Sequence, residues 1–174
     1  MKGCDIINFE DVIKKRTAVR KFSNKVVENN LIQKILEAGS LAPTAKNLQP
    51  QKIYVVSSKE GLEKVDSLTP CRYGAPVVLV ICSDKNIAWT NNNYSSYEMD
   101  ASIVATHMML EATNLGLGSI WVRYFDEEKI MECFNLESGV IPVCIMPIGY
   151  KDDSYTESIN HNIRKNINEY VEYI

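Results

Sequence analysis

One stretch of this chain, from about Tyr97 to Leu115, carries apolar side chains around most of the circumference of a helix. The residues that give this coverage are Ala101, Ile103, Val104, Ala105, Met108, Met109, Leu110 and Ala112. A helix that is apolar nearly all round has to be buried on most of its sides. In a chain of 174 residues, this predicts a central helix, a helix covered by a second subunit, or both.

Shorter elements surround this helix. The apolar spacing predicts helices after Asn8, from about Glu28 to Ala38, after Ser58 and after Asp126, and strands at 52–57, 76–82, 119–123 and 143–148. Gly39 fits the position just past a helix end, and the polar stretch 84–96 is typical of a loop. Strands and helices alternate, which by pattern alone favours a parallel doubly wound sheet. Neither repeats nor a linker occur, so we expect a single domain over residues 1–174.

Composition excludes several classes of function. The net charge is -3 and no basic run or stripe occurs, so nothing points to nucleic acid. The longest apolar run, Ala75 to Cys82, is too short to span a membrane, and residues 1–15 lack the apolar core of a signal peptide. These features predict a cytoplasmic protein.

The cysteines and histidines do not predict a metal site. The five cysteines include no pair with CxxC spacing, and His107 and His161 have no partner at ligand spacing. Cys82 and Cys144 lie in apolar runs and are expected to be small buried hydrophobes. Cys71 follows Pro70 in an expected loop, as either an incidental free thiol or a reactive one.

Three segments could bind a ligand. Arg16 and Arg20 are four residues apart and could hold a phosphate by charge-assisted hydrogen bonds, or form part of a solvated basic patch. The segment Pro43–Pro50 holds Thr44, Asn47 and Gln49 between two prolines; it could line a planar hydrogen-bonding ligand or be a rigid capping loop. The glycines in 115–121 could bring backbone amides to a ligand or end a helix.

In order and spacing, these segments resemble the nitroreductase family of FMN-dependent oxidoreductases. The resemblance runs through Arg16–Phe22, Ala42–Pro50, Asp100, Leu115–Trp121, Phe125–Glu128, Ile148–Tyr150 and Arg164–Val171. It therefore spans roughly residues 8 to 171. No single motif is decisive, but the occurrence of several motifs in the family's order argues against coincidence. The implied fold is α+β, with a mixed, mostly antiparallel sheet flanked by helices. We prefer this fold to the doubly wound sheet, because periodicity cannot reveal strand order.

The resemblance also implies residue roles. Arg16 and Arg164 match ligands of the FMN phosphate, with Thr17 and the Ala18 backbone beside them, and Arg20 matches a cation near flavin N1 and O2. The loop residues Pro43, Thr44, Asn47 and Gln49 match a segment that reaches the FMN of a partner subunit. Gly118, Trp121 and Arg123 belong to a strand expected to run along the flavin. Asp100 is expected to be a structural acid at a helix start rather than a base.

Four residues depart from the family pattern. Ala18 replaces a serine, Gln51 replaces a tryptophan that often follows Gln-Pro, Tyr124 stands where glycine is common, and Asn162 replaces a second cationic phosphate ligand. These changes predict weaker FMN binding or a narrower pocket.

The activity implied is hydride transfer from NADH or NADPH through flavin N5 to a small acceptor, by a ping-pong mechanism in a homodimer. The acceptor could be a nitroaromatic, a quinone, an enone or a flavin. No side-chain acid or base is expected, since hydride transfer to a flavin requires none. Two alternatives stay open: a flavin-binding carrier or sensor without turnover, and a small-molecule-binding protein that has lost FMN.

Overall fold

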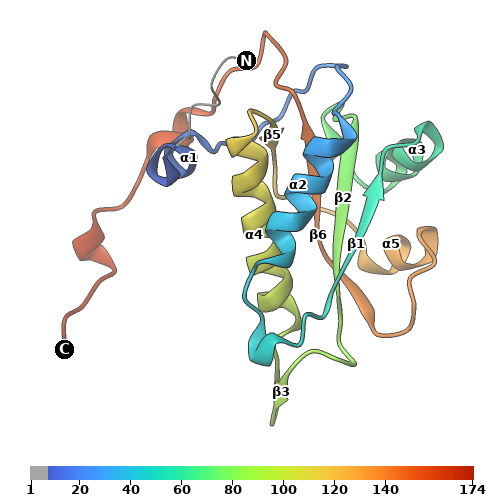
Figure 1. Cartoon of the computed structure of the whole chain (residues 1–174), viewed down its shortest axis with the longest axis vertical. Coiled ribbons are helices and arrows are strands. Elements are labelled where there is room, and N and C mark those ends of the chain that lie inside the picture. Colours follow the sequence, from blue (N-terminus) through green and yellow to red (C-terminus); the bar gives the residue numbers. More distant parts are fainter. Residues whose placement is uncertain (1–7) are drawn as a thin grey trace.

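The computed structural model describes residues 8–174, so Cys4 and the other residues before Asn8 lie outside it. The helices are α1 (Phe9–Lys15), α2 (Asn29–Ser40), α3 (Lys59–Leu68), α4 (Tyr97–Asn114) and α5 (Glu127–Cys133), and the strands are β1 (Gln51–Val56), β2 (Val77–Asp84), β3 (Thr90–Asn91), β4 (Tyr94–Ser95), β5 (Gly118–Ser119) and β6 (Val140–Gly149) (Figure 1). The predicted helix starts hold, because Asn8, Ser58 and Asp126 each accept a backbone N–H of the first turn.

The main sheet is antiparallel between its strands, in the order β1-β2-β6-β5. One parallel bridge, Ala18 to Ser119, joins the segment after α1 to this sheet. The central strand β2 is buried along nearly its whole length, as its run of Val, Leu and Ile predicts. The α+β prediction is confirmed, and the parallel order suggested by alternation alone is wrong.

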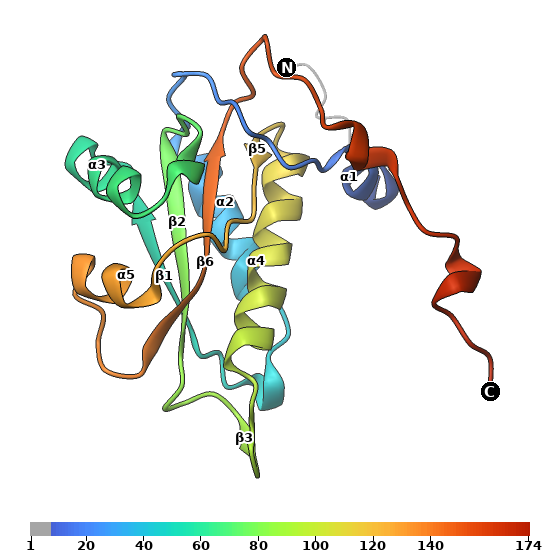
Figure 2. The ribbon, with the colours of Figure 1, turned by 180° about the vertical axis from the view of Figure 1, so that it is seen from behind.

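Helices cover both faces of the sheet. Helices α2 and α4 lie over one face, and α3 and α5 lie over the other (Figures 1 and 2). Helix α4 is central, as predicted, and Ala101, Val104, Ala105, Met108 and Ala112 are buried in the first layer. Its remaining face is only half-covered within this chain.

Three local predictions need correction. Gly39 lies inside α2, which ends at Ser40, and a Cβ on Gly39 would clash with the Met108 side chain. Close packing of α2 on α4, rather than a helix end, accounts for this glycine. The stretch 84–96 contains the small hairpin β3-β4, and the strand expected at 119–123 is reduced to β5 and a single bridge from Val122 to Ile145.

The C-terminal segment after Tyr155 forms an arm that leaves the body of the molecule (Figures 1 and 2). It holds two short 3-10 turns, Ile159–Asn162 and Ile167–Glu169, of which the second begins with a capping box between Asn166 and Glu169. Its large apolar side chains are exposed: Ile159, Ile163, Ile167, Tyr170, Tyr173 and Ile174. The arm therefore has local order but little cover from its own chain.

Candidate functional site

A pocket of about 230 Å³ opens where the chain passes from α1 to the sheet. Its lining is Arg16, Thr17, Ala18, Arg20, Ser158, Asn160 and His161. The lining contains two arginines and no carboxylate. Within residues 8–174, no ion pair engages Arg16, Arg20 or Arg164. The structure thus brings the predicted phosphate residues of the first segment together in a pocket suited to an anion.

Arg164 lies on the C-terminal arm and does not line this pocket. Its Nη1 donates to the carbonyl of His161, a pocket residue, and to the Ile163 carbonyl at 2.8 Å. Both contacts are local to the turn, and only His161 connects Arg164 to the pocket. Asn162 belongs to the same exposed turn.

Tyr155 forms hydrogen bonds to two residues of the pocket, and the sequence did not predict these bonds. Its hydroxyl lies 3.2 Å from the Ala18 carbonyl and 3.3 Å from the buried Thr17 hydroxyl. These bonds join residues 138 and 137 positions apart, so no local pattern could have predicted them. Tyr155 ties the start of the arm to the arginine segment.

Gly118 packs against Val19, within the segment that carries Arg16 and Arg20. The Val19 N–H donates to the Ser119 carbonyl at 3.0 Å, which draws β5 against residues 17–20. A Cβ on Gly118 would lie 2.7 Å from Val19 Cγ2, so only glycine permits this approach. Gly118 and Thr17 share a second small pocket with Gly116, near the last turn of α4. The glycines of 115–121 therefore lie next to the arginine segment, and their role toward a ligand stays a prediction.

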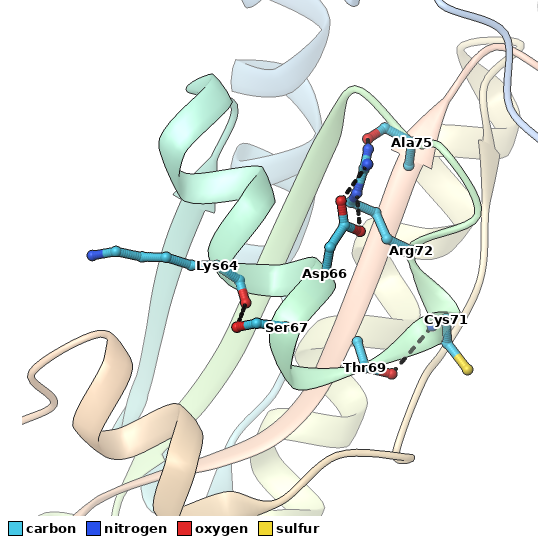
Figure 3. A network of polar contacts seen from close by, with 7 residues as sticks. All are labelled: Lys64, Asp66, Ser67, Thr69, Cys71, Arg72 and Ala75. Atoms are coloured by element: carbon cyan, nitrogen blue, oxygen red, sulfur yellow. Dashed lines mark hydrogen bonds and ion pairs between the residues drawn. The ribbon is translucent and has the colours of Figure 1, made fainter.

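A rigid loop between α3 and β2 flanks Arg20. Arg72 forms two 2.6 Å bonds to Asp66 and donates to the Ala75 carbonyl at 2.8 Å, whereas the sulfur of Cys71 points away from this pair (Figure 3). A hydrogen bond with the Cys71 thiol, then burial, raises the pKa of Tyr73, and the neighbouring Arg20 guanidinium opposes this rise. Cys71, Tyr73 and Arg20 are therefore neighbours.

Trp121 and Arg123 lie farther along the same chain segment. Trp121 is half-buried against the α4 layer, and Arg123 pairs with Glu127 and stacks over the Phe125 ring at 4.7 Å. The charge of Arg123 thus already has a partner, Glu127, within the chain. The Tyr124 ring is exposed, and its carbonyl accepts a 2.7 Å hydrogen bond from Thr69.

The loop Pro43–Pro50 lies at the opposite end of α4 from the arginine pocket (Figure 1). Ala45 contacts the first turn of α4, whereas the pocket shared by Thr17 and Gly118 includes Thr113 of the last turn. The 18 residues of α4 separate the two regions by about 27 Å, at about 1.5 Å per residue. Within one chain, the structure does not bring Pro43, Thr44, Asn47 and Gln49 to the arginines.

A larger cavity, of about 690 Å³, lies elsewhere, beside the open edge of β1. Its charged lining residues pair with one another, as Lys59 with Glu63 and Arg72 with Asp66. It offers no free charge to a ligand and contains none of the predicted site residues.

Residues 8–174 hold no cluster of metal-ligating side chains and no helix with the length and apolarity needed to cross a membrane. Cys82 and Cys144 are fully buried, as predicted, and burial raises the pKa of Cys82 to about 12. Neither thiol is suited to chemistry at neutral pH.

Comparison with known proteins identifies the family. The nitroreductase family profile matches residues 13–71 and 68–150. A nitroreductase family protein of Clostridium difficile 630 is 36% identical, with a TM-score of 0.90 over 96% of this chain and 98% of the other. An FMN-dependent nitroreductase of Clostridium difficile R20291 is 31% identical, with a TM-score of 0.75 over 93% and 96% of the two chains.

A curated relative agrees with these structures. A Methanothermobacter thermautotrophicus protein, provisionally named an NADH dehydrogenase/NAD(P)H nitroreductase, is 32% identical over 80% of this chain and 75% of its own length. The expected resemblance is confirmed over most of the described residues. The chain therefore belongs to the nitroreductase family, and the protein is an oxidoreductase of the nitroreductase type.

Proposed function

We propose that residues 1–174 form one FMN-binding domain that carries hydride from NADH or NADPH to a small acceptor: a nitroaromatic, a quinone, an enone or a flavin. The reaction would follow a ping-pong scheme, with reductant and acceptor using the site in turn. The observation that carries this proposal is the pocket with Arg16 and Arg20 and no carboxylate in its lining. A phosphate monoester is close to a dianion, and such a pocket suits it. A cytoplasmic location stays a prediction.

The residues present fit FMN. Arg16, Thr17 and the Ala18 backbone would hold the phosphate, and Arg164 would close the rim. Arg20, beside Tyr73, would face the polar edge of the ring system, with Gly118 behind it. Bound FMN would supply hydride acceptance and donation, which no side chain offers. The chain's own residues bind and orient the cofactor and place a cation near it.

The separation of the two predicted halves of the site supports a homodimer. The arginine pocket and the loop Pro43–Pro50 lie about 27 Å apart along α4, farther than one FMN molecule extends. If both contact the same flavin, they belong to different chains. The half-covered face of α4 and the exposed apolar arm support the same arrangement.

Anaerobic reduction tests the proposed activity. NADH or NADPH should bleach the absorbance of bound flavin rapidly, and a panel of acceptors should restore it. Flavin that stays oxidised with both nicotinamides would instead favour a carrier or sensor. Absence of visible flavin absorbance after soaking with FMN and desalting would indicate a protein that has lost the cofactor.

Arg20→Ala should lower the two-electron potential of bound flavin by about 20–40 mV. Reduction places negative charge on the flavin, and a nearby cation stabilises that charge. About 1.4 kcal/mol corresponds to about 30 mV for a two-electron couple, and solvent screening limits an exposed arginine to roughly this energy. Dye equilibration at saturating FMN measures the potential.

Two further variants make this measurement specific. Arg20→Lys should recover most of the shift, because a point charge suffices without bidentate geometry. Lys21→Ala is the matched control, since Lys21 pairs with Asp152 outside the pocket. An unchanged potential in Arg20→Ala would remove Arg20 from this role.

A further inference from the structure

Asp100 is a buried carboxylate with two specific contacts. It is 0% exposed, and Ser96 Oγ donates to Oδ2 at 2.7 Å. The second contact comes from a different part of the chain, because the Ala45 N–H donates to Oδ1 at 2.8 Å. A carboxylate is costly to bury unless hydrogen bonds compensate. Here one of those bonds holds the segment Pro43–Pro50 against α4.

The Pro43–Pro50 segment has a strained backbone that other contacts have to stabilise. Lys46, Asn47 and Gln49 all have positive φ, at 52°, 56° and 51°. Non-glycine residues adopt this region at a cost and keep it where the surrounding structure imposes it. Inside the segment, the Gln49 N–H donates to Thr44 Oγ1 at 3.0 Å, and Gln49 Nε2 donates to the Asn47 carbonyl at 3.3 Å.

These bonds determine which groups the segment can offer. Thr44 and Gln49 are partly used internally, whereas the Asn47 side chain is exposed and makes no hydrogen bond within residues 8–174. Its direction depends on the strained backbone around it. Ala45 begins the 3-10 turn Ala45–Asn47, so the bond from Asp100 fixes the start of the turn that carries Asn47.

We propose that Asp100 is a positioning residue for flavin binding: it holds the Pro43–Pro50 segment in the strained conformation that presents Asn47 to the ring system bound by the partner subunit. This inference rests on the proposed function and adds a residue to it. Asp100 does not touch the cofactor and acts only through Ala45.

The test compares two substitutions that break the bond from opposite sides. Asp100→Ala removes the acceptor carboxylate, and Ala45→Pro removes the N–H donor. Proline is compatible with the first position of a helical turn, and Thr44 before it is already extended, with φ -130° and ψ 157°. Ser58→Ala is the control, because it removes a helix cap of α3 away from both segments.

Both test variants should weaken FMN and riboflavin by the same factor, about tenfold in fluorescence titrations. Equal loss is expected because the segment faces the ring system, which both ligands share. Tryptic cleavage after Lys46 should also become faster. Ser58→Ala should lower the melting temperature and leave both affinities unchanged.

Several outcomes would overturn the inference. Flavin affinities within about twofold of wild type in folded Ala45→Pro, or a loss confined to FMN, would show that Asp100 does not position this segment. A wild-type protein that binds neither flavin would instead defeat the proposed function. If Asp100→Ala fails to fold, Ala45→Pro alone decides, because it leaves α4 intact.

Discussion

Arg16→Ala is expected to weaken FMN binding by about 10- to 100-fold and to change riboflavin binding by less than about threefold. Hydrogen bonds to a charged group contribute about 1.5–3 kcal/mol, and riboflavin lacks the phosphate that Arg16 would hold. Arg164→Ala should act in the same direction with a smaller effect, since its guanidinium is engaged by the His161 and Ile163 carbonyls and does not line the pocket. Flavin fluorescence quenching gives both affinities.

The control for this prediction is Lys14→Ala. Lys14 is a cation two residues from Arg16, but it pairs with Glu10 on α1 and does not line the pocket. Its removal should affect both ligands little. Wild-type protein with equal affinity for FMN and riboflavin would contradict the phosphate assignment, whatever the variants do.

Removal of residues 166–174 is expected to weaken the proposed homodimer by at least about 100-fold. This truncation keeps Arg164 and removes Ile167, Tyr170, Tyr173 and Ile174, whose exposed fractions are all at least 59%. Burial of one such side chain contributes about 1.5–3 kcal/mol, so even partial cover of four of them exceeds the energy of a hundredfold change. Sedimentation equilibrium over a range of concentrations gives the dissociation constant.

A point variant distinguishes the loss of apolar contact in the dimer from the effect of shortening the chain. Ile167→Asp should weaken the dimer in the full-length chain, whereas Asn168→Asp, at the adjacent exposed position, should have little effect. A full-length chain that sediments as a monomer at micromolar concentration with FMN still bound would contradict the dimer and the shared site together.

Local features of the site were predictable, and long-range ones were not. The spacing of Arg16 and Arg20 and the glycines of 115–121 predicted groups that meet in neighbouring pockets, because each depends on a few adjacent residues. Tyr155 escaped prediction because its contacts cross most of the chain. Gly39 was assigned to a helix end because periodicity does not reveal that α2 and α4 pack closely there.

Strand order shows the same limit. Alternating strands and helices favoured a parallel sheet, whereas the observed strand pairs are antiparallel. The spacing of hydrophobic residues indicates which side chains are buried, but it does not indicate the direction of the neighbouring strand. The resemblance of ordered motifs supplied that information.

The position of the two proposed half-sites at opposite ends of α4 has a genetic consequence. In a symmetric dimer, each flavin would use the arginines of one chain and the Pro43–Pro50 segment of the other. A heterodimer of an Arg16→Ala chain with an Ala45→Pro chain would then contain one site with both defects and one with neither. Two alleles that each weaken FMN binding would therefore restore one wild-type site when coexpressed, whereas two alleles altered within the same half-site would not.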